Sequence, residues 1–295
     1  KQILYNSTSR ESTLIYYILG TTRDERESIA QAYGNDLHIG IEKRLNGSFK
    51  ELVHALFKER AQFDIDELAR ASKGHAPQEE TFFEILFNRP NAQRQSIING
   101  AASKLGQSLE TFISTHFHKY TREGMVKMLK MNRCEESRLD RALAEKAAKA
   151  LAATTCDDWI NNDEILNYFG QLTPAELLLM GRLYKEKVGK HILNTIDVIG
   201  SKHKQVFFRT LYYVVVNPAE YFAKKINDAV KGLGTDERLL IRVITTRYDV
   251  DMSNIKKYYY DQTGETVRQT IYDDCSGTFK RLLIGLVHQL DNNEI

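Results

Sequence analysis

The sequence is poor in the residues that build small disulfide-bonded or turn-rich folds. It has only 3 cysteines, 4 prolines and 17 glycines in 295 residues. Cys134, Cys156 and Cys275 are far apart and no C-x-x-C pair occurs, so neither a zinc ribbon nor a disulfide framework is indicated. The scarcity of proline and glycine argues against an all-β sandwich. Because the few cysteines indicate no disulfide framework, we expect a reducing, cytoplasmic compartment.

An excess of one charge and long apolar runs are also missing. Lysine and arginine number 41 against 39 acidic residues, which gives a net charge of +2, whereas nucleic-acid binders usually show a stronger basic excess. The longest stretches without a charged residue, 12–22 and 165–175, have 11 residues each, and a bilayer span needs roughly 17 to 25. Nothing at the N-terminus resembles a signal peptide. We expect no membrane span and no nucleic-acid partner.

The residues that are present follow a helical period. Apolar side chains recur at three- and four-residue steps in segments 139–151, 239–244 and 282–290, which is typical of amphipathic helices. We find no convincing alternation with the two-residue period of a strand. The pattern predicts an all-α fold.

Two segments of the chain repeat a common frame. Residues 73–79 read KGHAPQE and residues 231–237 read KGLGTDE, 158 positions later. This spacing accommodates two units of about 79 residues, so a four-unit array accounts for the length. The predicted boundaries are 1–62, 63–132, 133–217 and 218–295. We expect most of the first helix of the first unit to precede Lys1.

The last quarter of the chain carries a family resemblance. KGLGTDE, followed after Arg238 by LLIRVITTR, resembles the first loop and second helix of an annexin repeat. The family pattern is K-G-x-G-T, then 38 residues, then Asp or Glu, and Asp274 stands at that position after Thr235. Residues 140–151 resemble the connector that enters the third annexin repeat. One intact site among eroded ones is similar to the alpha-giardins. The resemblance implies four annexin-type repeats of about five helices each in a slightly curved disc.

The resemblance also implies a calcium site in the fourth repeat. Its ligands would be the carbonyl oxygens of Val230, Gly232 and Gly234 and the carboxylate of Asp274. Ca²⁺ prefers oxygen ligands, and closely spaced glycines let a loop turn its carbonyls outward. Lipid phosphate or carboxylate oxygens would fill the open coordination positions, which implies calcium-dependent binding to acidic phospholipid membranes. The alternative interpretation of the glycines is a helix cap and a tight turn.

The other repeats depart from the pattern at identifiable positions. In the second, Ala76 and Pro77 replace Gly and Thr, and His116 stands where the acid belongs. Ile199 aligns with the acid in the third repeat, and Arg44 in the first. We therefore expect no site of this type in these three repeats.

Glu51 in the first repeat has two interpretations. Its carboxylate and the loop carbonyls near Leu45 would form a lesser calcium site, or it is an ordinary solvated charge on a helix. Trp159 also has two: it dips into a membrane interface, or it is buried against its own loop. Leu233 is expected to be simply exposed. We expect Arg23, Arg89 and Arg247 to be structural cations, each paired inside its own repeat.

No constellation of residues indicates an enzyme. The G-x-G-x-x-G pattern is broken by Glu237, no H-E-x-x-H occurs, and the EF-hand-like start at residues 249–253 lacks the later ligands. Two functions remain. The first is a calcium-dependent linker between acidic membrane, at the inner face of the plasma membrane, and the cytoskeleton. The second is a calcium-independent helical scaffold that binds cytoskeletal proteins. Asp274 favours the first, because a scaffold needs no acid there.

Overall fold

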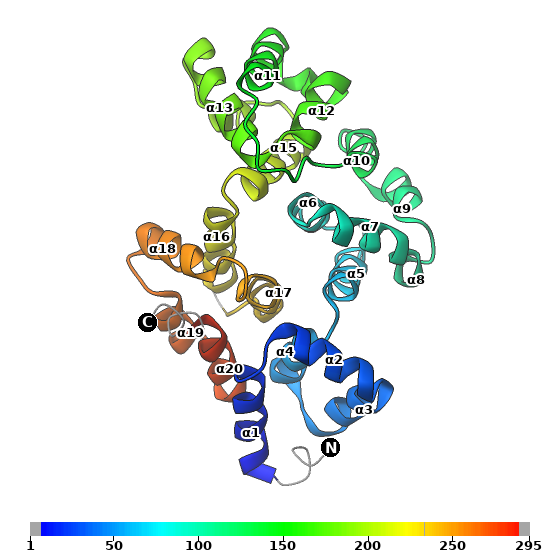
Figure 1. Cartoon of the computed structure of the whole chain (residues 1–295), viewed down its shortest axis with the longest axis vertical. Coiled ribbons are helices and arrows are strands. Elements are labelled where there is room, and N and C mark those ends of the chain that lie inside the picture. Colours follow the sequence, from blue (N-terminus) through cyan, green and yellow to red (C-terminus); the bar gives the residue numbers. More distant parts are fainter. Residues whose placement is uncertain (1–6, 233, 289–295) are drawn as a thin grey trace. The chain divides into compact units, whose positions relative to one another are not determined.

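The chain is helical throughout the part that its computed structural model describes, residues 7–232 and 234–288 (Figure 1). These ranges contain α1 to α20 and a short 3₁₀ helix, η2, and they contain no strand. The prediction of an all-α fold is confirmed. No helix within these ranges is long and apolar enough to cross a membrane. The chain divides into two compact units, residues 1–63 with 219–295, and residues 64–218.

The first unit joins helices from the two ends of the sequence. The N-terminal helices are α1 (Ser7–Leu19), α2 (Arg23–Tyr33), α3 (Asn35–Arg44) and α4 (Gly47–Leu56). The C-terminal helices are α16 (Pro218–Val230), α17 (Glu237–Arg247), α18 (Met252–Thr263), α19 (Val267–Asp274) and α20 (Gly277–His288). Helices α1 and α4 both pack against α20, and α4 also packs against α17. Ile18, Leu52, Leu240, Leu282 and Leu286 are fully buried in this core.

The second unit contains the middle of the sequence. Its first helices are α5 (Arg60–Ala71), α6 (Glu79–Asn88), α7 (Asn91–Gly100), α8 (Ala102–Leu105), α9 (Leu109–His116) and α10 (Arg122–Leu129). The later ones are α11 (Arg141–Ala153), η2 (Cys156–Asn161), α12 (Asp163–Gln171), α13 (Pro174–Val188), α14 (Ile192–Ile196) and α15 (Lys202–Val216). Helix α5 begins three residues before position 63, where the second repeat is predicted to start.

Local sequence determines where many of these helices begin and end. Thr173 caps α13: its side chain accepts a hydrogen bond from the Glu176 amide, and the Glu176 side chain accepts one from the Thr173 amide. This reciprocal pair satisfies two amides that the first helical turn leaves without partners. The same helix ends at Gly189, whose φ of 73° is a conformation that suits glycine.

Internal repetition appears in the backbone hydrogen bonds. In the loop before α17, the Asp236 amide donates to Ala229 O at 2.7 Å, and the Gln78 amide donates to Ala71 O at 2.8 Å before α6. In both loops a second bond follows, from the amide of the next glutamate to the carbonyl two residues back. The two loops thus share their turn although the residues inside them differ.

Trp159 belongs to the core of the second unit. Its side chain is fully buried, and its indole Nε1 donates to Thr154 O at 3.1 Å. The rings of Tyr184 and Phe208 contact it edge to face. The interpretation of Trp159 as a residue that enters a membrane is therefore wrong, and the interpretation as a buried packing residue is confirmed. Leu233 lies outside the described residues.

The three arginines expected to be structural all form buried or half-buried ion pairs. Arg89 binds both carboxylate oxygens of Asp64 at 2.8 Å. Arg247 pairs with Asp251 one turn further along. Arg23 instead pairs with Asp249, 226 residues away, so the prediction of pairing inside its own repeat is wrong for Arg23. Such a long-range pair follows from the packing of α2 near the end of α17, which the linear sequence does not reveal.

The Arg89–Asp64 pair provides a test of the second unit. The side chains of Arg89 and Asp64 are only 5% and 1% exposed, so Arg89→Ala leaves a buried carboxylate without its cation. We expect the free energy of unfolding to fall by about 3 kcal/mol or more. Lys127→Ala removes a cation from the exposed pair with Asp163 and should cost less than about 1 kcal/mol. Urea unfolding measures both losses, and equal losses would contradict this assignment.

Candidate functional site

The loop at residues 231–236 joins α16 to α17 and contains two glycines in an unusual conformation. Gly232 has a φ of 116° and Gly234 a φ of 87°. Side chains disfavour these values, although a Cβ at either position would meet no atom within 4 Å. The backbone conformation, and not a lack of space, therefore requires glycine here. Asp236 then caps α17 by accepting a hydrogen bond from the Leu239 amide at 2.9 Å.

Among the described residues of this loop, Thr235 makes a hydrogen bond to the acidic residue predicted to act with it. The Thr235 hydroxyl donates to the backbone carbonyl of Asp274 at 3.1 Å. Asp274 is the last residue of α19, immediately before the short loop that leads into α20. The bond brings together residues 39 positions apart in the sequence, and it places the start of the Asp274 side chain beside the glycine loop.

The oxygens at this place are available to a ligand. The carbonyls of Val230, Gly232 and Gly234 accept no hydrogen bond from the backbone N–H of another described residue. Asp274 is exposed, and its carboxylate makes no hydrogen bond or ion pair within the described part of the chain. Three carbonyls and a carboxylate are the oxygen donors that Ca²⁺ prefers.

The charge near this loop also suits a cation. Burial raises the pKa of the Cys275 thiol to about 11, and the negative charges of Glu237 and Asp274 contribute to the increase. Across residues 7–232 and 234–288, no group of three or more His, Cys, Asp or Glu side chains lies at metal-binding distance. A site here would accordingly rest mainly on backbone carbonyls, and its residues fit calcium in that form.

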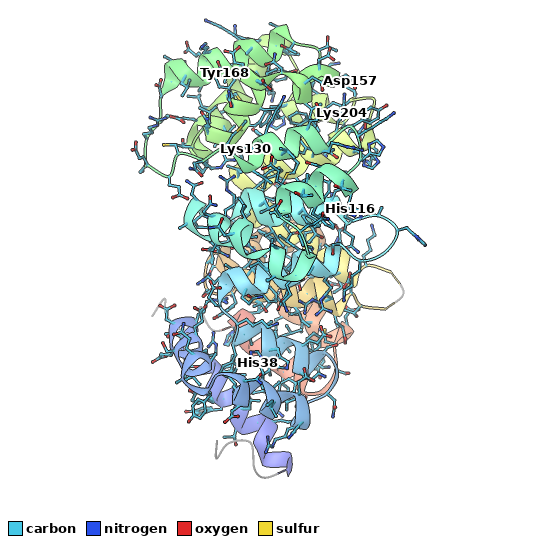
Figure 2. The ribbon with its side chains drawn as sticks, turned by 90° about the vertical axis from the view of Figure 1, so that its right-hand side faces the viewer. His38, His116, Lys130, Asp157, Tyr168 and Lys204 are labelled. Atoms are coloured by element: carbon cyan, nitrogen blue, oxygen red, sulfur yellow. The ribbon has the colours of Figure 1, made fainter. Side chains whose placement is uncertain are left out.

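The corresponding position in the other repeats holds different chemistry. Helix α9 ends at His116 and α3 ends at Arg44, as α19 ends at Asp274. Figure 2 labels His116. Its Nδ1 lies 3.0 Å from Phe112 O on the same helix. Ile199 is buried and offers no side-chain oxygen. Among the described residues no non-glycine has a positive φ, so Ala76 does not reproduce the conformation of Gly234.

Glu51, the candidate ligand in the first repeat, has a basic neighbour. Its Oε2 accepts a hydrogen bond from Arg238 Nη1 at 3.1 Å, and Arg238 lies in the first turn of α17. Nearby, the Ser48 hydroxyl donates to the Glu237 carboxylate. A cation at Glu51 would have to compete with Arg238. Sequence reasoning missed this ion pair, because no local pattern relates residues 187 positions apart.

These features define a class: an all-α repeat protein with a two-glycine loop between α16 and α17 and an acidic residue beside it. The sequence model of the annexin family matches residues 63–128 and 221–286. Annexin A13 of Mus musculus is 29% identical over 283 residues, which cover 94% of this chain and 89% of that protein.

Solved structures share the fold of this chain. Annexin III has a TM-score of 0.87 at 24% identity, with 97% of this chain and 90% of that chain covered. Calcium-bound alpha-1 giardin has a TM-score of 0.73 at 19% identity, with 95% and 94% covered, which is consistent with the alpha-giardin resemblance and shows the shared fold. The family model, the annexin relatives and the solved annexin structures together support a place in the annexin family. Annexins in general bind phospholipid in a calcium-dependent manner and are not enzymes.

Gly234 provides a test of the loop. In Gly234→Ala, the added Cβ disfavours the positive φ, so the loop and the carbonyl oxygens that the site needs should shift. We expect calcium affinity, measured by titration calorimetry with phospholipid vesicles present, to fall at least several-fold. Gly106→Ala is the matched control, because Gly106 has a φ of 72° at the end of α8, in the second unit. Equal affinity in the two variants would show that the loop is not the site.

Proposed function

We propose that this protein binds acidic phospholipid membranes through one dominant calcium site in the fourth repeat. The proposed ligands are the carbonyl oxygens of Val230, Gly232 and Gly234 and the carboxylate of Asp274. The observation that carries the proposal is the Thr235–Asp274 hydrogen bond, which holds the glycine loop and the acid together. The family membership supports the general activity, and the chain's own residues support the location.

The glycines, Thr235 and Asp274 have different roles in the proposed site. The glycines at positive φ shape the loop, Thr235 ties it to α19, and Asp274 supplies the negative charge. Bound calcium would supply positive charge and open positions for the phosphate or carboxylate oxygens of lipid headgroups. Because one carboxylate contributes little charge, we expect weak calcium binding without lipid, near the weak end of about 10⁻⁴ to 10⁻³ M.

Glu51 is proposed as a secondary site at most. Its ion pair with Arg238 keeps a positive charge 3.1 Å from the carboxylate, which opposes a cation. Glu51 is 41% exposed, so a headgroup or ion can still reach it. Its contribution should therefore be visible only when the site at Asp274 is lost.

The cellular role extends this proposal. We propose a peripheral location at the inner face of the plasma membrane and a linking role toward the cytoskeleton. A net charge of +2 makes calcium important, because electrostatic attraction of the protein alone to an acidic surface is weak. The competing proposal is a calcium-independent scaffold that binds cytoskeletal proteins through the same helical surfaces.

Two neighbouring aspartates allow a matched test. Asp274→Asn removes the proposed ligand charge, while Asp273→Asn changes an exposed carboxylate that accepts a hydrogen bond from Gln269 at 2.8 Å. Co-sedimentation with phosphatidylserine vesicles is measured over a calcium titration and after chelation. We expect Asp274→Asn to lose most calcium-dependent pelleting and Asp273→Asn to retain it, with unchanged helical circular dichroism in both.

Other results would redirect the proposal. Full binding by Asp274→Asn would place the site elsewhere, and Glu51→Gln would then be the next variant. Pelleting of the wild type that ignores calcium and chelator, or no pelleting at millimolar-order calcium, would favour the scaffold.

A further inference from the structure

Two histidines in the first unit face each other from neighbouring helices. His38 lies on α3 and His54 on α4, and their Nδ1 atoms are 3.2 Å apart (Figure 2 labels His38). The ring planes differ by 15° and the ring centres are 5.2 Å apart. Since the centres are much farther apart than the Nδ1 atoms, the rings meet edge to edge. The two Nδ1 atoms therefore point into the same narrow space.

Glu42 determines how His54 carries its proton. Glu42 lies one turn after His38 on α3, and its Oε1 is 2.9 Å from His54 Nε2. An ionised carboxylate can only accept, so His54 donates from Nε2. When His54 is neutral, its Nδ1 therefore keeps a free electron pair directed at His38.

The spacing matches that of two ligands on one metal ion. Zinc binds imidazole nitrogen at about 2.0–2.1 Å, so two nitrogens on a tetrahedral ion are about 3.3 Å apart. The Nδ1 atoms of His38 and His54 are 3.2 Å apart without any ion between them. A metal-binding histidine also typically donates its second N–H to a carboxylate, as His54 does to Glu42.

We propose that His38 and His54 bind a divalent transition-metal ion of the zinc type through their Nδ1 atoms. Glu42 is the positioning residue, and water completes the coordination. His38 carries its proton on Nε2 in the bound form. This site is separate from the calcium loop, because calcium takes oxygen ligands and imidazole suits zinc, copper and nickel.

The charges around the pair indicate a modest affinity. The ammonium of Lys50 binds the other oxygen of Glu42 at 2.9 Å, and Lys58 also lowers the pKa of His54. Both cations oppose a divalent ion, and the Glu42 carboxylate offsets one of them. Low pH should abolish binding, because protonated imidazoles have no free electron pair for a metal.

A second histidine pair in the chain serves as the control. His118 and His203, in the second unit, have ring centres 3.7 Å apart and planes that differ by only 7°. These rings stack face to face, and His118 Nδ1 accepts a hydrogen bond from the Tyr120 amide at 3.3 Å. This pair does not direct two nitrogens at one ion, so His203→Gln should leave zinc binding unchanged.

The test is calorimetric titration of the full chain with Zn²⁺ in saturating calcium. Saturating calcium keeps the oxygen-ligand loop out of the measurement, so the result is independent of the proposed lipid binding. We expect one zinc site in the wild type, a loss of affinity of at least tenfold in His38→Gln and in His54→Gln, and about 10- to 100-fold in Glu42→Gln. Each variant should keep the wild-type melting temperature without zinc to within a few degrees.

Three results would overturn the proposal. Unchanged zinc affinity in His38→Gln and His54→Gln would place the metal elsewhere, for example at a cysteine. An equal loss in His203→Gln would show a general effect of histidine removal. No zinc binding by the wild type would mean that the pair is only a hydrogen bond between two imidazoles. If a glutamine variant unfolds, two other measurements test the proposal. A zinc affinity of the wild type that falls from pH 7.5 to pH 5.5, together with a weaker affinity in Glu42→Gln, would support it. Unchanged zinc affinity in both measurements would overturn it.

Discussion

The hydrogen bond from Thr235 to the Asp274 carbonyl is the interaction on which the candidate calcium site depends. It joins the loop after α16 to the end of α19, so two residues 39 positions apart in the sequence lie in contact. Asp236 of the same loop caps α17 by accepting from the Leu239 amide, so Asp274 is the acid whose carboxylate is left without a hydrogen bond or ion pair among the described residues. The positive φ angles of Gly232 and Gly234 matter for the proposed site because this bond brings the backbone of Asp274 to the same loop.

The repeats keep their backbone while their chemistry differs. The loops before α6 and α17 have the same hydrogen bonds, yet Ala76 and His116 remove the conformation and the charge that the fourth repeat has. A helical array tolerates such losses because its stability comes from packing between helices and not from the loops. The first unit carries the proposed calcium site, and it also contains the histidine pair of α3 and α4. The histidine pair offers nitrogen ligands, whereas the loop offers oxygen ligands.

Much of the fold could be predicted from the sequence, and less of the site's surroundings. The helical period predicted the all-α class, and the K-G-x-G-T frame indicated which loop and which acidic residue lie together. Trp159 shows the limit, because a loop position does not reveal whether a side chain turns inward onto Phe208. The partners of Arg23 and Glu51 were missed for a related reason: each lies about 190 or more residues away, and only packing brings them together.

The most direct measurement is a crystal structure of the full chain grown with calcium. Anomalous scattering would locate each ion. The account predicts the strongest peak at 2.3–2.6 Å from the carbonyl oxygens of Val230, Gly232 and Gly234 and from the Asp274 carboxylate. A strongest peak at Glu51, or no ion within the loop at residues 231–236, would contradict the central claim.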